Sequence, residues 1–141
     1  MGSFSFKGEN VRQWLESIAT QKVTAIEPGR CAYTHFLDHD GYLIDDMIFA
    51  VVSENEILGV PNASMIPVMW EWFTSLLPED GSVVLEDLSP TTSIIALQGP
   101  DAKRFCEVTL GLQNHVGRFR WARIQENELE ITGWIQGTGY T

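Results

Sequence analysis

The sequence predicts an α+β domain in which helices pack against a mostly antiparallel sheet. Three observations lead to this fold class. Apolar runs with a period of two alternate with segments of helical spacing, and two neighbouring runs are joined by a tight turn. The stretch SIIALQGPDAKRFCEV also repeats the design of FSFKGENVRQWL, because each reads as a strand, a glycine, a capping residue and a helix. This repeat suggests a weak internal duplication.

The N-terminal part of the chain is predicted to form a strand and then a helix. Phe4 to Lys7 are apolar enough for a short buried strand, and Gly8-Glu9-Asn10 lead into VRQWLESIA. Asn10 suits the N-cap position because its side-chain oxygen can accept from the first free backbone N–H groups. The predicted apolar stripe of this helix consists of Val11, Trp14, Leu15 and Ile18.

A hairpin, a further strand and a second helix are predicted to follow. Pro28-Gly29 interrupts the chain before CAYTHFLD, and the turn DHDG joins that strand to GYLIDDMIFAVV at residues 41–52. After the turn at 53–55 come the strand EILGV and the helix MIPVMWEWFTSLL, which is supported by the spacing of Trp70, Phe73 and Leu77. A strand in SIIALQ, a helix from Asp101 and the strand-like ELEITGWIQGTGYT complete the expected order.

Composition and charge narrow the class of protein. At 141 residues, with 44% hydrophobic and 20% charged side chains, the chain suits one soluble domain with a sizeable core. The formal charge of −10 would repel a phosphate backbone, so nucleic acid is not expected as a partner. No segment has the length or pattern of a membrane span or a secretory signal, and we expect a cytoplasmic protein. Cys31 and Cys106 have no CxxC spacing and are expected to be buried, reduced thiols.

Two adjacent carboxylates interrupt the most apolar predicted strand. Asp45 shares a strand face with Met47 and Phe49, whereas Asp46 shares the opposite face with Ile48 and Ala50. Each carboxylate therefore needs hydrogen-bond donors, a cation or a ligand. One interpretation is structural, with one aspartate capping backbone N–H groups and the other paired with Arg30 or Lys22. The other interpretation is functional, with one aspartate orienting a ligand or handling a proton.

Metal sites are not predicted from the motifs present. DHDG resembles the start of a calcium loop, but the twelfth position is Phe49 rather than an acidic ligand. His35 and His39 are four apart on a predicted strand and turn, where that spacing does not form a chelate. His115 has no candidate partner nearby in the sequence.

Taken together, EPGRCAYTHFLDHDGYLIDDMIFAVV, VPNAS, ALQGPDA and TGYT resemble the folate-binding portion of the aminomethyltransferase family, the T-protein of the glycine cleavage system. The motifs cover essentially the whole chain in the family's order. Members of that family have sequence before an S-H-M-G-like element, which Met1-Gly2 resemble, and a long continuation after TGYT. The resemblance therefore implies that residues 1–141 are a folate-binding domain fragment, truncated at both ends relative to the family.

The resemblance also implies a function and a set of site residues. It implies transfer of a one-carbon unit from an aminomethyl-lipoyl carrier protein to tetrahydrofolate, with release of ammonia. Asp46 corresponds to the family's acidic residue placed against the folate. The other positions that line the folate pocket in the family are Met1, Tyr33, Asn62 and Tyr140. Asn62 follows a predicted strand, where its amide could offer both a donor and an acceptor to a pterin edge.

Departures from the family pattern leave other functions open. Tyr42, Ala50 and Pro61 replace residues more usual in the family, which leaves open a folate-dependent demethylase acting on a small O-, N- or S-methylated donor. A non-catalytic folate-binding module is a third possibility, although the related iron–sulfur assembly proteins carry a cysteine motif near the position of QGTGYT, where this chain has none. The family's acidic residue that grips the pterin lies beyond TGYT, so the isolated chain is expected to be inactive.

Overall fold

The computed structural model describes residues 1–109, 117–124 and 129–139. The chain divides into two compact units, residues 1–94 and 95–141, which are described separately. The first unit holds a five-stranded sheet with two α-helices, and the described residues of the second hold one short helix and a two-stranded sheet.

Antiparallel strands form the whole sheet of the first unit, in the order β2-β3-β4-β1-β5. This arrangement confirms the predicted α+β fold class with a mostly antiparallel sheet. The elements of this unit are β1 (Phe4–Lys7), α1 (Val11–Ile18), η1 (Val23–Ala25), β2 (Arg30–Leu37), β3 (Leu43–Ser53), β4 (Glu56–Pro61), η2 (Ala63–Met65), α2 (Ile66–Ser75) and β5 (Val84–Asp87).

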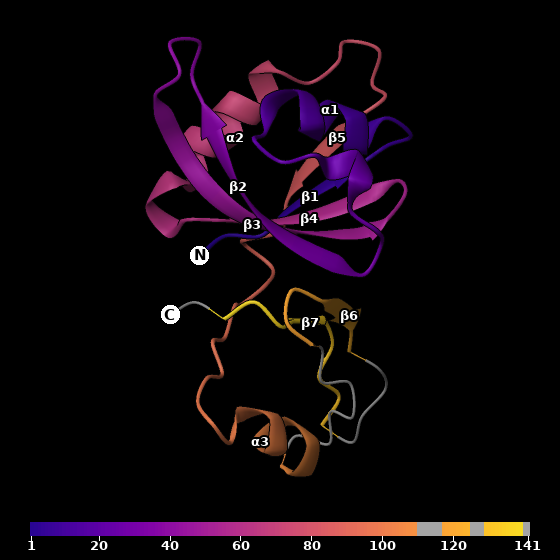
Figure 1. Cartoon of the computed structure of the whole chain (residues 1–141), viewed down its shortest axis with the longest axis vertical. Coiled ribbons are helices and arrows are strands. Elements are labelled where there is room, and N and C mark those ends of the chain that lie inside the picture. Colours follow the sequence, from indigo (N-terminus) through magenta and orange to yellow (C-terminus); the bar gives the residue numbers. More distant parts are fainter. Residues whose placement is uncertain (110–116, 125–128, 140–141) are drawn as a thin grey trace. The chain divides into compact units, whose positions relative to one another are not determined.

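The hydrophobic core lies between one face of this sheet and its two helices, which cover the same face (Figure 1). The ring of Phe73 on α2 packs edge to face on Phe6 and Phe36, with centroids 5.0 Å apart in both pairs. Such aromatic pairs add to the free energy gained from burial of their area. Trp14 ties the two helices together, because its Nε1 donates to the Leu76 carbonyl at 2.8 Å.

The predicted helices are present, with two local corrections. Asn10 occupies the N-cap position of α1, but its side chain makes no capping hydrogen bond. On α2 the buried residues are Met69 and Phe73, whereas Trp70 keeps 37% of its surface exposed. The predicted buried stripe is therefore wrong at Trp70, because the neighbouring Met69 is the buried residue. Pro67 stands in the first turn of α2, where its missing N–H leaves no helical bond unmade.

The predicted hairpin is confirmed. Asp38 Oδ1 accepts from the backbone N–H of Asp40 at 3.0 Å and of Tyr42 at 2.8 Å, while Gly41 adopts a φ of 85°. The carboxylate therefore closes a turn, as aspartates commonly do. Among the described residues, no group of three or more His, Cys, Asp or Glu side chains could hold a metal ion.

The last strand of the main sheet is not where the sequence predicted it. SIIALQ forms no strand, and Ile95 and Leu97 are exposed. The edge position beside β1 is instead taken by β5, which the sequence analysis missed. An apolar run does not by itself determine which segment pairs at a given edge, and here β5 pairs with β1.

The predicted duplication is visible at the turns into α1 and α3 (Ala102–Val108). Gly8 and Gly99 have φ values of 147° and 120°, and Asn10 and Asp101 have φ values of −106° and −97°. The first backbone bonds also correspond, since the N–H three residues after each glycine donates to that glycine's carbonyl, at 3.2 and 3.1 Å. The repeat is therefore local to the turn and does not extend to the preceding strand.

The second unit contains α3 and a short antiparallel pair, β6 (Trp121–Arg123) and β7 (Trp134–Gln136). Both cysteines are free, with Cys31 buried and Cys106 half-buried, which confirms reduced thiols and corrects the expectation of full burial for Cys106. Over the residues described, no helix is long and apolar enough to cross a membrane.

Candidate functional site

Four residues from neighbouring strands lie in a row at the end of the main sheet, on the face turned away from the helices. They are His35, Asp46, Asn62 and Met1. His35 pairs with Asp46 between β2 and β3. Pro61 is the last residue of β4 to pair with β3, opposite Met47, so Asn62 continues that register opposite Asp46. The N–H of Gly2 donates to the Pro61 carbonyl at 3.0 Å, which extends the β1–β4 ladder and places Met1 beside Asn62.

Hydrogen bonds join this row to both carboxylates. The Asn62 Nδ2 lies 2.8 Å from Asp46 Oδ1, 3.2 Å from the Asp46 carbonyl and 2.9 Å from Asp45 Oδ1. The Tyr33 hydroxyl donates to Asp46 Oδ2. Asp46 therefore has a donor on each oxygen and is held between two neighbouring strands. Tyr33 and Met1 each leave 41% of their surface exposed, so the site has accessible aromatic and apolar walls.

The two aspartates lie on opposite faces of β3, as the alternation of side chains along a strand predicted. Asp45 is 7% exposed and lies on the core face, whereas Asp46 is half-buried on the other face. Among the salt bridges of the described residues, neither carboxylate pairs with Arg30 or Lys22. The structural interpretation with those cations is therefore wrong, and an amide and a phenol hydroxyl serve as the donors.

The structure brings together four of the five residues implied by the family resemblance: Met1, Tyr33, Asp46 and Asn62. Tyr140 lies outside the described residues, as does His115. His35 was considered from the sequence only as a metal ligand, and its place in this row was not predicted; its ring meets Tyr33 edge to face with centroids 5.0 Å apart. Its signal was available, because His35 is two residues from Tyr33 and so lies on the same face of the strand.

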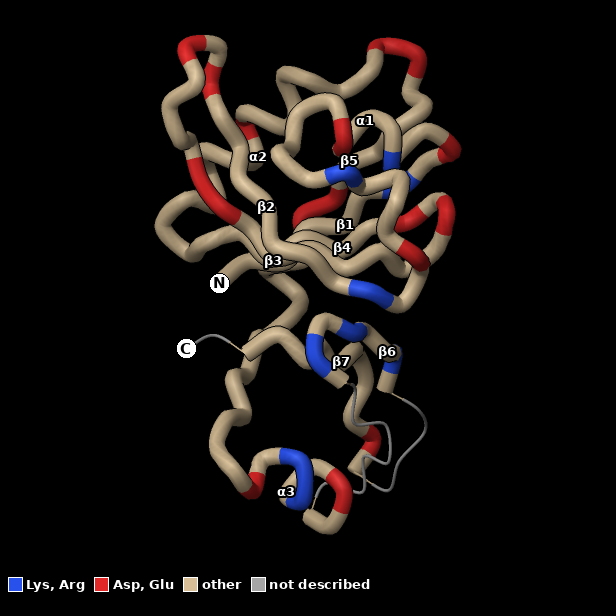
Figure 2. The backbone as a smooth tube through the Cα atoms, in the orientation of Figure 1, with Lys and Arg blue, Asp and Glu red and all other residues tan. Residues whose placement is uncertain are grey.

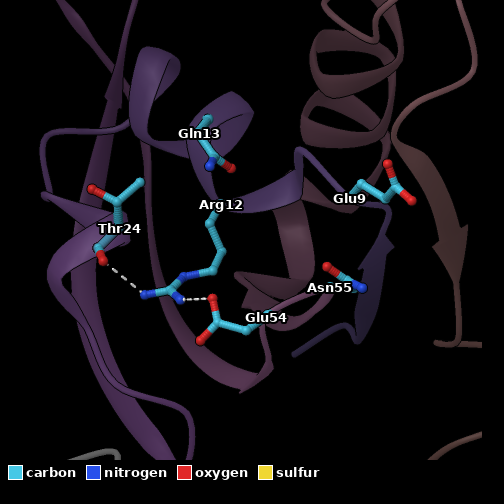
Figure 3. A pocket seen from close by; sticks show the side chains of 6 residues that line it. All are labelled: Glu9, Arg12, Gln13, Thr24, Glu54 and Asn55. Carbon is cyan, nitrogen blue, oxygen red and sulfur yellow. Dashed lines mark hydrogen bonds and ion pairs between the residues drawn. The ribbon is translucent and has the colours of Figure 1, made fainter.

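A separate cavity of about 180 Å³ lies between α1, η1 and the β3–β4 turn (Figure 3). Arg12, 8% exposed, donates through Nη2 to the carbonyls of Thr24 at 2.8 Å and Ile26 at 2.6 Å, and through Nη1 to the Glu54 carboxylate. These bonds connect α1, the η1 segment and the β3–β4 turn. The polar groups that line the cavity therefore have a structural role. Its lining consists of Glu9, Arg12, Gln13, Thr24, Glu54 and Asn55.

The negative charge is concentrated in the first unit. Residues 1–94 hold fourteen acidic and four basic side chains, whereas residues 95–141 hold five of each. Figure 2 shows acidic residues along the loops of the first unit, including the β2–β3 turn, and on β3 at the aspartate pair. A ligand that approaches this unit meets acceptor groups, so hydrogen-bond donors and positive charge are favoured there.

The chain is similar to proteins named aminomethyltransferases. The aminomethyltransferase of Thermosynechococcus vestitus is 31% identical over 145 residues, which cover all of this chain and 37% of that protein. The aminomethyltransferase of Bacteroides fragilis is 34% identical over 141 residues, which again cover all of this chain and 38% of that protein. The chain thus spans less than two fifths of the length of these relatives.

A solved structure shares the fold. The glycine cleavage system aminomethyltransferase T from Bartonella henselae superposes with a TM-score of 0.76 at 16% identity, over 89% of this chain and 34% of that one. The profile of the GCVT N-terminal domain matches residues 1–141. The chain therefore belongs to the GCVT N-terminal domain family.

Proposed function

We propose that this chain forms part of the tetrahydrofolate site of an aminomethyltransferase, in which Asp46 is the acidic residue placed against the ligand. The observation that carries this proposal is the row of His35, Asp46, Asn62 and Met1 with the Tyr33 hydroxyl on the Asp46 carboxylate. Relatives that cover the whole chain are named aminomethyltransferases.

The residues of the row suit a flat heterocycle that carries N–H groups. Asp46 supplies acceptor oxygens, and the accessible surfaces of Tyr33 and Met1 lie beside it. Ligand sites typically combine apolar and aromatic walls with a few fixed polar groups. Tetrahydrofolate, when bound, would accept the one-carbon unit from the donor.

In this proposal the chain acts by orientation and charge. The Tyr33 hydroxyl and the Asn62 amide hold one oxygen each of the Asp46 carboxylate, so the carboxylate needs little rearrangement when a ligand arrives. The fixed negative charge favours positive charge that develops on a neighbouring amine. The remaining lone pairs of the carboxylate accept hydrogen bonds from the ligand's N–H groups.

Calorimetric titration of tetrahydrofolate under reducing conditions tests the site. We expect the 141-residue chain to bind and Asp46→Ala to weaken binding about tenfold or more, since a charged acceptor is lost. Asp40→Ala at the hairpin turn removes the same charge far from the site and should bind like the parent. A folded chain that releases no heat, or equal affinity of the parent and Asp46→Ala, would contradict the proposal.

The donor is tested separately. We propose an aminomethyl group on a lipoylated carrier protein, with release of ammonia. A chimera in which this chain replaces the matching segment of the Thermosynechococcus vestitus relative can be assayed with that carrier and with small methylated donors. Ammonia release with the carrier alone supports the aminomethyl donor. Turnover only with methylated donors would instead support a folate-dependent demethylase.

A further inference from the structure

The buried aspartate of the pair is not explained by the fold. Asp45 is 7% exposed on the core face of β3, and its Oδ2 has no hydrogen-bond partner among the described residues. A buried polar atom without a partner destabilises the folded state. The neighbouring positions of that face, Met47 and Phe49, are apolar, so an apolar residue would serve the core better.

Among the described residues, the one side-chain hydrogen bond of Asp45 leads to the candidate site. Its Oδ1 lies 2.9 Å from Asn62 Nδ2, the same nitrogen that lies 2.8 Å from Asp46 Oδ1. Successive strand residues point to opposite faces, so Asp45 and Asp46 cannot ordinarily share a partner. They share one here because Asn62 lies just past the end of β4, where its amide reaches both sides of β3.

The amide nitrogen of Asn62 is fully committed by these contacts. It carries two hydrogens and has three oxygen acceptors within 3.2 Å. The Asn62 Oδ1 accepts no hydrogen bond from the part of the chain that the structure describes. An amide can adopt two orientations related by a flip, and two carboxylates around Nδ2 favour the one in which Oδ1 is free.

We propose that Asp45 is a positioning residue that acts through Asn62. Its buried carboxylate holds Nδ2 from below the strand, so that Asn62 presents Oδ1 as an acceptor beside the Asp46 carboxylate. The ligand group that meets Asn62 is then a hydrogen-bond donor. The sequence allowed Asn62 to offer a donor and an acceptor, and this geometry leaves only the acceptor. The ligand part of the inference rests on the proposed function, whereas the orientation of the amide does not.

The side-chain amide of Asn62 gives a direct readout in ¹H–¹⁵N spectra of the 141-residue chain, assigned by its loss in Asn62→Ala. Asp45→Leu keeps the branching at Cγ and the number of side-chain heavy atoms but has no acceptor, and we expect the Asn62 signals to shift and their hydrogen exchange to accelerate. Asp45→Asn keeps an acceptor oxygen and should restore both. Val51→Ala is the matched control, because it truncates a buried residue of the same face of β3 away from Asn62. Unchanged Asn62 signals in Asp45→Leu would overturn the proposal.

Stability and affinity should move in opposite directions. Asp45→Leu removes an unpartnered buried oxygen, so we expect unfolding at an equal or higher denaturant concentration. Its affinity for tetrahydrofolate should fall about 5- to 10-fold, as for one lost hydrogen bond, and Asp45→Asn should bind within about twofold of the parent. If Asp45 had only a structural role, Asp45→Leu would instead lower the stability and leave the affinity for tetrahydrofolate unchanged.

The two proposals fail in different ways. A parent chain that does not bind tetrahydrofolate would overturn the proposed function and the ligand role of Asp45, while the amide signals would still decide whether Asp45 orients Asn62. Full affinity in Asp45→Leu, in a parent that binds, would overturn the role of Asp45 alone.

Discussion

The Tyr33 hydroxyl donates to the Asp46 carboxylate although the two residues are not paired, since Tyr33 lies opposite Ile48 and Asp46 lies opposite His35. The contact is a diagonal across β2 and β3, a distance that only a long side chain spans. Tyr33 thus links two strands on the face away from the core. There the hydrogen bond fixes the orientation of the Asp46 carboxylate and buries little apolar surface.

Tyr33→Phe should therefore affect the site more than the fold. The variant keeps the ring against His35 and removes one hydrogen bond to a carboxylate, so we expect tetrahydrofolate affinity to fall about tenfold. The melting temperature should hardly change, because the Tyr33 side chain is 41% exposed. Tyr42→Phe, at a residue 72% exposed beside the turn, is the control. Equal losses in both variants would argue against a specific Tyr33–Asp46 contact.

Arg12 should be a major contributor to stability without a role in the site. Arg12→Met keeps the apolar stem but removes the side-chain donor to the carbonyls of Thr24 and Ile26, and we expect a loss of about 2–4 kcal/mol in denaturant unfolding. Glu54→Gln should cost less than about 1 kcal/mol, because the Glu54 side chain is 70% exposed. Similar losses in both variants would mean that the ion pair, and not the carbonyl bonds, is the main contribution.

The strand faces of the candidate site could be predicted from the sequence, but its pairing could not. Period-two alternation correctly separated Asp45 from Asp46. The turn at 53–55 pairs Ser53 with Glu56, and that register, if continued, would place Asn62 opposite Met47 on the core face. An irregularity between Val51 and Ser53 shifts the register by one residue and moves Asn62 opposite Asp46. No local pattern in the sequence indicates this register shift.

The misplaced strand has a related physical cause. SIIALQ has the apolar pattern of a strand, whereas β5 consists of two apolar and two acidic residues, Val84-Leu85-Glu86-Asp87. Only one strand can occupy the edge beside β1, and β5 pairs there through Val84 and Lys7 to Asp87 and Phe4. Local pattern measures the ability to form a strand, whereas the choice between two candidates depends on chain connection and available edges.

A side chain at Gly59 should destabilise the core. An added Cβ would lie 2.7 Å from Met47 Sδ and 3.0 Å from Phe6 Cε2 in the buried core. Gly59→Ala is therefore expected to lower the free energy of unfolding by about 1–3 kcal/mol through overpacking. In a double-mutant cycle, Met47→Ala should make room for the added methyl, so the double variant should lose less than the sum of the single losses. Additive losses would show that the close approach to Met47 is not the cause.

A hydrogen-bonded carboxylate on α1 should make stability depend on acid. Thr24 donates to Glu16 Oε2 from its hydroxyl at 2.6 Å and its backbone N–H at 2.8 Å, and these bonds, the hydroxyl first, lower the pKa of Glu16 below 4.5. A lowered pKa means that the unfolded chain binds the proton more readily. The contribution is therefore present above pH 4.5 and is lost as the pH falls below it. The stability difference between the parent and Glu16→Gln should shrink between pH 7 and pH 3, and Thr24→Val should reduce that pH-dependent difference. A constant difference would contradict the assignment.

The buried thiol of β2 should be chemically inert in the folded protein. Burial raises the pKa of Cys31 from 9.0 to about 12, and the nearby positive charge of Arg30 only partly opposes this. Because the thiolate is the reactive form, iodoacetamide at pH 8 should modify Cys31 in a Cys106→Ser chain only as fast as the protein opens. The half-buried Cys106 in a Cys31→Ser chain should react faster, as measured by intact mass.

The same raised pKa predicts the alkaline behaviour of the fold. The unfolded thiol loses its proton near pH 9, whereas the folded thiol keeps it to about pH 12, so the folded state binds the extra proton in that interval. The contribution of the neutral thiol is thus complete below pH 9 and is lost as the pH rises toward 12. The unfolding free energy of the parent should fall over this range more steeply than that of Cys31→Ala. Parallel pH profiles, or rapid alkylation of the folded Cys106→Ser chain, would mean that solvent reaches Cys31.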